Sequence, residues 1–130
     1  ITCRDWSSDV CSSDLIRKLL ARNGVIGISP FNIFLNAAWL EDGGKPAISL
    51  RLVAEQIDYI CQIAGDVRHV GIGTDFDGGF GVELVPAEID TIADLPRLFP
   101  FLEELGYDSQ AIERIASGNF LEMIENALPD

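Results

Sequence analysis

Residues 69–78 read HVGIGTDFDG, a short run of apolar and glycine residues that delivers two carboxylates. Such a run is typical of a strand buried on both faces, as in a parallel sheet or barrel. Functional loops of α/β proteins lie beyond the carboxyl ends of their strands, which makes Asp75 the leading candidate for a catalytic or substrate-binding group. Asp77 falls in the following turn, where bonding of its side chain to backbone amides is a sufficient structural role.

The sequence before this stretch predicts a strand, a helix and a second, parallel strand. Residues 25–29 (VIGIS) are typical of a short buried strand, preceded by a helix over residues 16–23 that ends at Gly24. Ser49 is placed to cap a second helix, in which apolar residues recur at spacings of three and four until Gly65. A strand, a crossover helix and a parallel strand form a right-handed βαβ unit.

The remaining sequence predicts a long loop and several closing helices. Residues 31–46 are too long for an ordinary connection and are expected to line the mouth beyond the strands. After the second strand, Asp94, Asp108 and Asn119 mark the starts of three further helices.

Together these segments resemble the end of the membrane (renal) dipeptidase family of zinc metallopeptidases, with HVGIGTDFDG as the signature. The resemblance covers residues 16–130 and implies an α/β fold, the C-terminal part of a (β/α)8 TIM-like barrel of the metal-dependent hydrolase type. Two parallel strands cannot bury both faces of a sheet, so this part is expected to be incomplete on its own. The flanks that match are residues 23–29, 52–60, 105–107 and 118–121.

The resemblance implies hydrolysis of dipeptides by two zinc ions, which activate the attacking water and polarise the scissile carbonyl. In the family, an aspartate at the end of the last barrel strand contacts the substrate amine and assists proton transfer, and Asp75 occupies the matching position. The family's zinc ligands are histidines and acids on earlier strands. This chain has one histidine, His69, which precedes its strand and is interpreted as structural. We therefore expect no zinc ligands here and no activity from this part alone.

The first fifteen residues are interpreted separately. Residues 5–15 (DWSSDVCSSDL) match the translation of a common sequencing-library adapter, so residues 1–15 are predicted to be non-native and are left out of the domain that spans 16–130. Taken as protein instead, their serines and aspartates lack apolar periodicity, which predicts disorder.

Composition limits the partners. The formal net charge of −12 argues against nucleic acid and anionic membranes, which are bound through lysine and arginine. No segment approaches the roughly 20 apolar residues of a membrane helix. Cys61 is the one cysteine outside the first fifteen residues; it is predicted to be a core residue, and a cytoplasmic location is weakly favoured over export. The expected partner is a dipeptide, with a homodimer of the intact protein left open.

Two other functions stay open at this point. An apolar strand that ends in Asp75 and Asp77 also resembles the first motif of haloacid-dehalogenase-like phosphatases, in which two aspartates hold magnesium. That family also needs a later lysine, and no lysine follows Lys45. The third hypothesis is a noncatalytic interaction fragment in which Phe31, Phe34 and Trp39 form an exposed patch.

Overall fold

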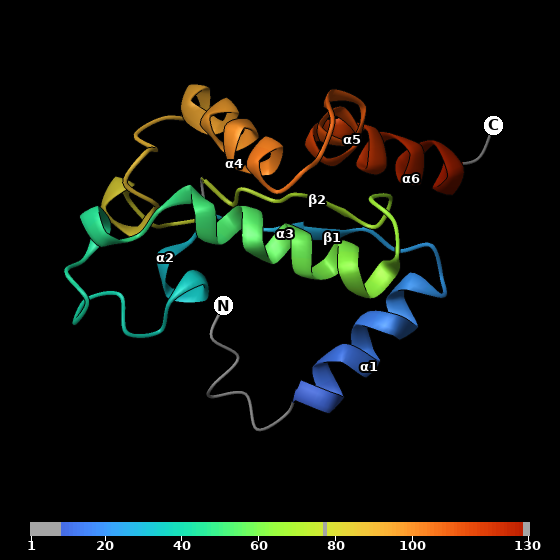
Figure 1. Cartoon of the computed structure of the whole chain (residues 1–130), viewed down its shortest axis with the longest axis horizontal. Helices are drawn as coiled ribbons and strands as arrows, with labels where there is room; N and C mark the ends of the chain where they lie inside the picture. The colour runs from blue at the N-terminus through green and yellow to red at the C-terminus, as the bar shows by residue number, and fades with distance from the viewer. Residues whose placement is uncertain (1–8, 77, 129–130) are drawn as a thin grey trace.

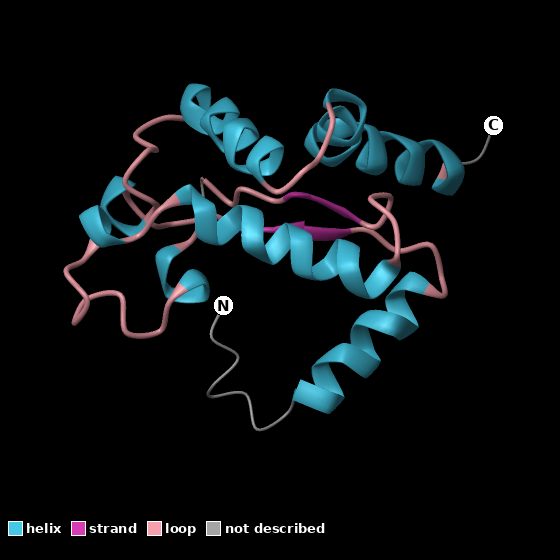
Figure 2. Ribbon diagram, in the orientation of Figure 1, coloured by secondary structure: helices cyan, strands magenta, loops and turns pink. Residues whose placement is uncertain are grey.

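The computed structural model describes residues 9–76 and 78–128 and contains a parallel pair of strands with helices around it (Figures 1 and 2). Strand β1 (Ile26–Ile28) pairs with β2 (Val70–Ile72), with Gly27 opposite Gly71. Helix α3 (Leu50–Ala64) connects them. The predicted strand, helix and parallel strand are confirmed, with a first strand shorter than the predicted 25–29.

Helix α3 has the boundaries that its sequence predicts. The Ser49 hydroxyl accepts a hydrogen bond from the Arg51 amide at 3.2 Å, and Gly65 takes the left-handed conformation (φ 77°) that ends the helix. The buried face of the helix joins the valines and isoleucines of both strands in one hydrophobic core. The buried residues of α3 are Leu50, Val53, Ala54, Ile57, Ile60 and Cys61.

Glycines form the other face of the strand pair because an aromatic ring lies on it. Phe120 comes from α6 (Asn119–Ala127), and a Cβ added to Gly71 would lie 2.7 Å from its Cδ2 atom. A Cβ on Gly27 would lie 3.4 Å from Cζ of the same ring. The paired glycines therefore leave the room that Phe120 fills.

The other helices surround this unit, with α2 and the long loop after β2 at the carboxyl ends of the strands (Figure 1). Helix α1 packs against α3, and the segment η4 packs against β2. No helix within residues 9–76 and 78–128 is long and apolar enough to cross a membrane. The remaining helical segments are α1 (Asp9–Leu20), α2 (Asn32–Leu35), η1 (Lys45–Ala47), η2 (Val82–Leu84), η3 (Ile92–Leu98), α4 (Phe99–Glu104), α5 (Ser109–Glu113) and the π-helical turn η4 (Arg114–Gly118).

The first helix differs from its prediction at both ends. Helix α1 begins at Asp9, so residues 9–15 are helical where their composition predicts disorder. The helix continues into Ile16, whose side chain packs against the core and supplies the anchor that the polar segment lacks. At its other end Asn23, not Gly24, takes the left-handed conformation (φ 56°), which asparagine tolerates better than most residues.

The closing helices begin largely where polar residues predict them. The Asp108 carboxylate accepts a hydrogen bond from the Ala111 amide at 2.8 Å and caps α5. Thr91, however, is the N-cap of η3, and Asp94 is the reciprocal partner in a capping box instead of the first helical residue. Asn119 begins α6 as predicted, but η4 runs directly into it, so Asn119 is free to act elsewhere.

Candidate active site

Asp75 lies beyond the carboxyl end of β2, in an exposed position. Its φ of 53° falls in the left-handed region, which costs energy for a residue with a Cβ, although aspartate is among the side chains that tolerate it. The Asp75 carbonyl accepts a hydrogen bond from the Gly78 amide at 2.9 Å, which closes a tight turn. This turn changes the direction of the chain just after the strand, and the Asp75 side chain lies exposed at the start of the turn.

Gly78 leaves room for that carboxylate. A Cβ at position 78 would collide with both carboxylate oxygens of Asp75. The neighbouring Gly79 has a φ of 91°, a conformation that a side chain would strain. Any residue other than glycine at position 78 would therefore have to displace the carboxylate. Asp77, predicted to be structural, lies outside the described residues.

A buried asparagine joins the end of β1 to the loop that follows Asp75. Asn32, in α2, has no exposed surface, and its Nδ2 donates a hydrogen bond to the Val85 carbonyl at 3.0 Å. Among the described residues, neither Asn32 Oδ1 nor the buried Ser29 Oγ has a hydrogen-bond partner. Asn32 was not predicted from the sequence, although a polar residue just after a strand, in a segment expected to line the mouth, was the available signal.

The loop after Asp75 lines an open, largely apolar recess of about 220 Å³. Phe76 begins it, and Val82 and Ile92 form an outer rim that remains 48% and 61% exposed. Its apolar lining is Phe76, Phe80, Val82, Val85, Ile89 and Ile92.

One lysine holds this loop in place. Lys45 Nζ donates hydrogen bonds to the carbonyls of Val82 at 2.9 Å and Ile89 at 2.5 Å, and it pairs with the Asp90 carboxylate at 2.9 Å. Only 21% of the Lys45 side chain is exposed, whereas the Asp90 side chain is 75% exposed, so the ion pair lies at the surface and the two backbone contacts hold the lysine. A lysine near two glycines gave no sequence signal for this contact, because its partners, two backbone carbonyls and the Asp90 carboxylate, lie more than thirty residues away along the chain.

The aromatic residues of the predicted patch separate. Trp39 is buried, whereas Phe34 is 66% exposed. Phe31 contacts both Phe34 and Phe80, a residue of the recess. Its ring centroid lies 5.0 Å from that of Phe34 and 4.5 Å from that of Phe80. The hypothesis of one exposed patch is therefore wrong for Trp39, which the core takes up because of its large apolar surface.

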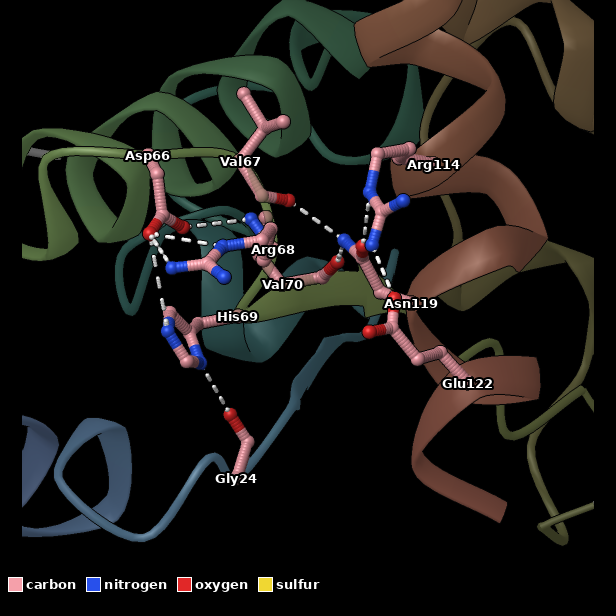
Figure 3. A network of polar contacts seen from close by, with 9 residues as sticks. All are labelled: Gly24, Asp66, Val67, Arg68, His69, Val70, Arg114, Asn119 and Glu122. Carbon is pink, nitrogen blue, oxygen red and sulfur yellow. Dashed lines mark hydrogen bonds and ion pairs between the residues drawn. The ribbon is translucent and has the colours of Figure 1, made fainter. Parts of the chain in front are cut away.

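The amino end of the strand pair carries a different kind of cluster (Figure 3). His69 Nδ1 lies 3.0 Å from the Gly24 carbonyl, and its Nε2 faces Asp66 at 3.9 Å. Burial works to raise the pKa of Asp66, but hydrogen bonds from the Arg68 amide and guanidinium outweigh it and lower the pKa. His69 thus lies at the end opposite Asp75 and makes structural contacts, as its position in the sequence predicts.

Asn119 completes this cluster from α6. Its Nδ2 donates hydrogen bonds to the carbonyls of Val67 at 2.6 Å and Val70 at 2.7 Å (Figure 3). Its Oδ1 accepts one from Arg114 Nε at 3.2 Å, and Arg114 also pairs with Glu122. Both polar atoms of this buried amide, Nδ2 and Oδ1, therefore have hydrogen-bond partners. These bonds tie α6 to the start of β2.

The described residues do not form a metal centre. Within residues 9–76 and 78–128, no three histidine, cysteine, aspartate or glutamate side chains gather closely enough to hold an ion. Cys61 is buried, and burial raises the pKa of its thiol, which disfavours the thiolate form that metals bind. The two zinc ions that the resemblance implies therefore do not fit the residues in hand.

Comparison with a solved structure shows the fold. The chain superposes on part of the crystal structure of an amidohydrolase from Pseudomonas aeruginosa with a TM-score of 0.70, at 21% identity, over 87% of this chain and 39% of that one.

Three curated sequences align with most of the chain. An uncharacterized protein from the pqqA 5′ region of Klebsiella pneumoniae is 33% identical over 111 residues, and an uncharacterized dipeptidase of Schizosaccharomyces pombe is 35% identical over 110. Dipeptidase aclJ of Aspergillus oryzae is 30% identical over 111 residues. Each alignment covers 85% of this chain, which spans only 24% to 38% of the relatives' own length.

The profile of the family described as membrane dipeptidase (peptidase family M19) matches residues 10–128, which is nearly all of the chain. The match contains the strand, helix and strand unit, the turn that carries Asp75 and the closing helices. The chain belongs to the membrane dipeptidase family.

Proposed function

We propose that this chain is the C-terminal part of a metal-dependent dipeptidase with a (β/α)8-type barrel, and that Asp75 binds the substrate amine. The observation that carries the proposal is the parallel β1–β2 pair, which delivers Asp75 beyond its carboxyl end in a chain that belongs to the dipeptidase family. In barrels of this type the catalytic groups gather at that end of the strands.

The chemistry of Asp75 follows from its position. An exposed carboxylate in a turn can accept charge-assisted hydrogen bonds from the free ammonium group of a dipeptide. The leaving amine of the hydrolysed bond needs a proton, and a carboxyl group within hydrogen-bond reach can pass one on. Gly78 supports this role because a side chain at this position would occupy the space that the Asp75 carboxylate fills.

A metal would polarise the scissile carbonyl and activate the attacking water in such an enzyme. We place the ligands of the two proposed zinc ions outside the described residues, because these contain no suitable cluster. The contribution of this chain is therefore to bind and orient the substrate.

Zinc content and hydrolysis test the proposal directly. The 130-residue chain is expected to bind no stoichiometric zinc and to cleave no dipeptide, whereas the full-length protein should do both. Zinc analysis after exhaustive dialysis and release of free amino acids are the measurements. Stoichiometric zinc on the short chain, or a full-length protein that cleaves no dipeptide, would overturn the proposal.

Genomic sequence upstream of the Ile16 codon tests the proposed boundary at residues 1–15. An in-frame extension that carries further histidines and acids would support both the barrel and the non-native origin of these residues. A genomic sequence that encodes residues 1–15 as they stand would contradict that origin.

The phosphatase alternative has less support. Its reaction needs a lysine near the aspartates, and the side chain of Lys45 is committed to the Val82, Ile89 and Asp90 acceptors. An assay of the full-length protein with p-nitrophenyl phosphate and magnesium separates the two activities, and we expect no turnover.

A further inference from the structure

Helix α6 carries apolar side chains on two of its sides. Phe120 lies on the glycine face of the strand pair, whereas Leu121 and Ile124, three positions apart, share another side of the helix. Leu121 is 57% exposed and Ile124 47%, and Leu128, one turn later at the end of the helix, is 65% exposed. Among the described elements α6 packs mainly against β2 and η4, so these three residues, the α6 patch, form an uncovered apolar surface.

Helix α6 begins at the outer edge of β2. The His69 carbonyl and the Gly73 amide both bond to β1, so the backbone groups of Val70 and Ile72, which alternate with them, point to the opposite edge. Asn119, the first residue of α6, donates a hydrogen bond of 2.7 Å to the Val70 carbonyl at that edge. Within the described ranges the sheet consists of β1 and β2, so this edge has no strand beside it. The α6 patch therefore starts two residues from an open sheet edge.

The segment best suited to cover this region belongs to the same polypeptide. The chain spans only 24% to 38% of the relatives' own length, so most of each relative lies outside the matched part. A closed barrel has no open strand edge, and the proposed barrel therefore needs a strand from its upstream part beside β2.

Charge disfavours a second copy of the chain as the occupant. Glu125, four positions after Leu121, borders the α6 patch, and the chain has a formal net charge of −12. Two α6 helices placed face to face would bring their Glu125 carboxylates together, and like charges in contact weaken an interface. A segment from the upstream part does not impose this symmetric contact.

We propose that the α6 patch is an internal interface of the full-length protein, against which the upstream part packs where its strand pairs with the free edge of β2. The inference rests on the proposed function only for the place of this chain at the C-terminal end of a longer barrel. Helix α6 then has two roles, because Phe120 covers the glycines of the strand pair and the α6 patch anchors the segment that completes the sheet.

Maleimide labelling of the full-length protein tests this interface, with the parent protein as the background. The Leu121→Cys thiol should react at least about tenfold more slowly in the native protein than in urea, because a buried thiol reacts only after local opening. The matched control is Asn126→Cys, because Asn126 is exposed on the same helix and helical spacing places it on the side opposite Ile124. The control thiol should react at nearly the same rate in both conditions.

Thermal unfolding supplies a second measurement. Leu121→Asn and Ile124→Asn should each lower the thermal midpoint of the full-length protein by about 5 °C, because an amide buried without a partner is destabilising. Leu121→Met, which keeps an apolar side chain of similar volume, and Asn126→Ser should leave the midpoint unchanged.

Equal labelling of Leu121→Cys in native and denatured protein, or an unchanged midpoint in both asparagine variants, would overturn the interface and leave the dipeptidase proposal untouched. Protection of position 121 that is lost when a dimer dissociates on dilution, followed by sedimentation velocity, would assign the α6 patch to a second copy and also overturn the interface. A protein that keeps the protection but binds no zinc and cleaves no dipeptide would support the interface and overturn the proposed function.

Discussion

The two ends of the β1–β2 pair differ in how far their polar groups have hydrogen-bond partners. At the amino end, Asn119, His69 and Asp66 all have polar partners, and the network links strands to helices. At the carboxyl end, Asp75 sits in a strained backbone conformation, Asn32 keeps an acceptor without a described partner, and an apolar recess stays open. In β/α barrels the amino end serves stability and the carboxyl end serves catalysis, and the proposed function assigns the same two roles to the ends of this strand pair.

Asp75→Asn should have the largest effect and should act on activity alone. We expect kcat/KM of the full-length protein for dipeptides to fall by about 10³-fold, within the range for loss of a group that assists proton transfer. Asparagine also tolerates the left-handed conformation, so the thermal midpoint should stay unchanged. The control is Asp66→Asn at the opposite end, which should retain full activity. A variant at position 75 with normal turnover would remove the contrast between the ends.

Substitution of the two buried asparagines compares the ends in stability. Asn119→Leu should destabilise the protein by about 3 kcal/mol, because it leaves the buried Val70 carbonyl and the partly buried Val67 carbonyl without a donor. Asn32→Leu should cost about 1 kcal/mol, since only the Val85 carbonyl loses its donor and an unpaired acceptor disappears. Denaturant unfolding of both full-length variants measures the difference; equal losses would mean that the carboxyl end is as tightly bonded as the amino end.

Gly71→Ala tests the glycine face between the two ends. The new methyl group would meet the Phe120 ring, with 2.7 Å to Cδ2, and overpacking of this kind costs about 1–3 kcal/mol. The double variant with Phe120→Leu should recover part of the loss, because the smaller side chain leaves space. A double variant as unstable as the sum of the single ones would show that the contact with Phe120 is not the cause.

Acid should weaken the amino end slightly. Arg68 lowers the pKa of Asp66 below its ordinary value of 3.8, so the resulting stability is fully present above pH 3.8 and is lost as the pH falls through the lowered value. Because the Arg68 side chain is largely exposed, Asp66→Asn should cost less than about 1 kcal/mol at pH 7. The difference from the parent should shrink below pH 3.8; a constant difference in denaturant titrations would contradict this origin.

Local signals predicted the parts of the fold that local chemistry controls. Ser49 and Gly65 bound α3, and the apolar runs mark both strands and their parallel pairing. The start of α1 at Asp9 escaped prediction because its support comes from packing farther along the helix. The same applies to the exchange of roles between Thr91 and Asp94, since either residue is a good N-cap by composition.

The sequence allowed the acidic residue of the candidate site, Asp75, to be predicted, but not the residues around it. Asp75 follows from the strand pattern, whereas the contributions of Asn32 and Lys45 depend on partners 53 and up to 45 positions away along the chain. The recess likewise gathers Phe76 and Ile92 through irregular backbone, which has no periodicity to detect. Sequence patterns indicate which strand ends matter, but the shape of a loop emerges only from long-range contacts.

The seat of Phe120 on the glycine pair has a practical consequence for anyone who shortens or labels this polypeptide. A stop codon placed after Gly118 would remove Phe120 and expose the glycine backbone of both strands to solvent. An affinity tag fused beyond Leu128 would leave Phe120 in its position on Gly27 and Gly71. Helix α6 therefore covers one face of the strand pair, and truncation within it is expected to destabilise the fold.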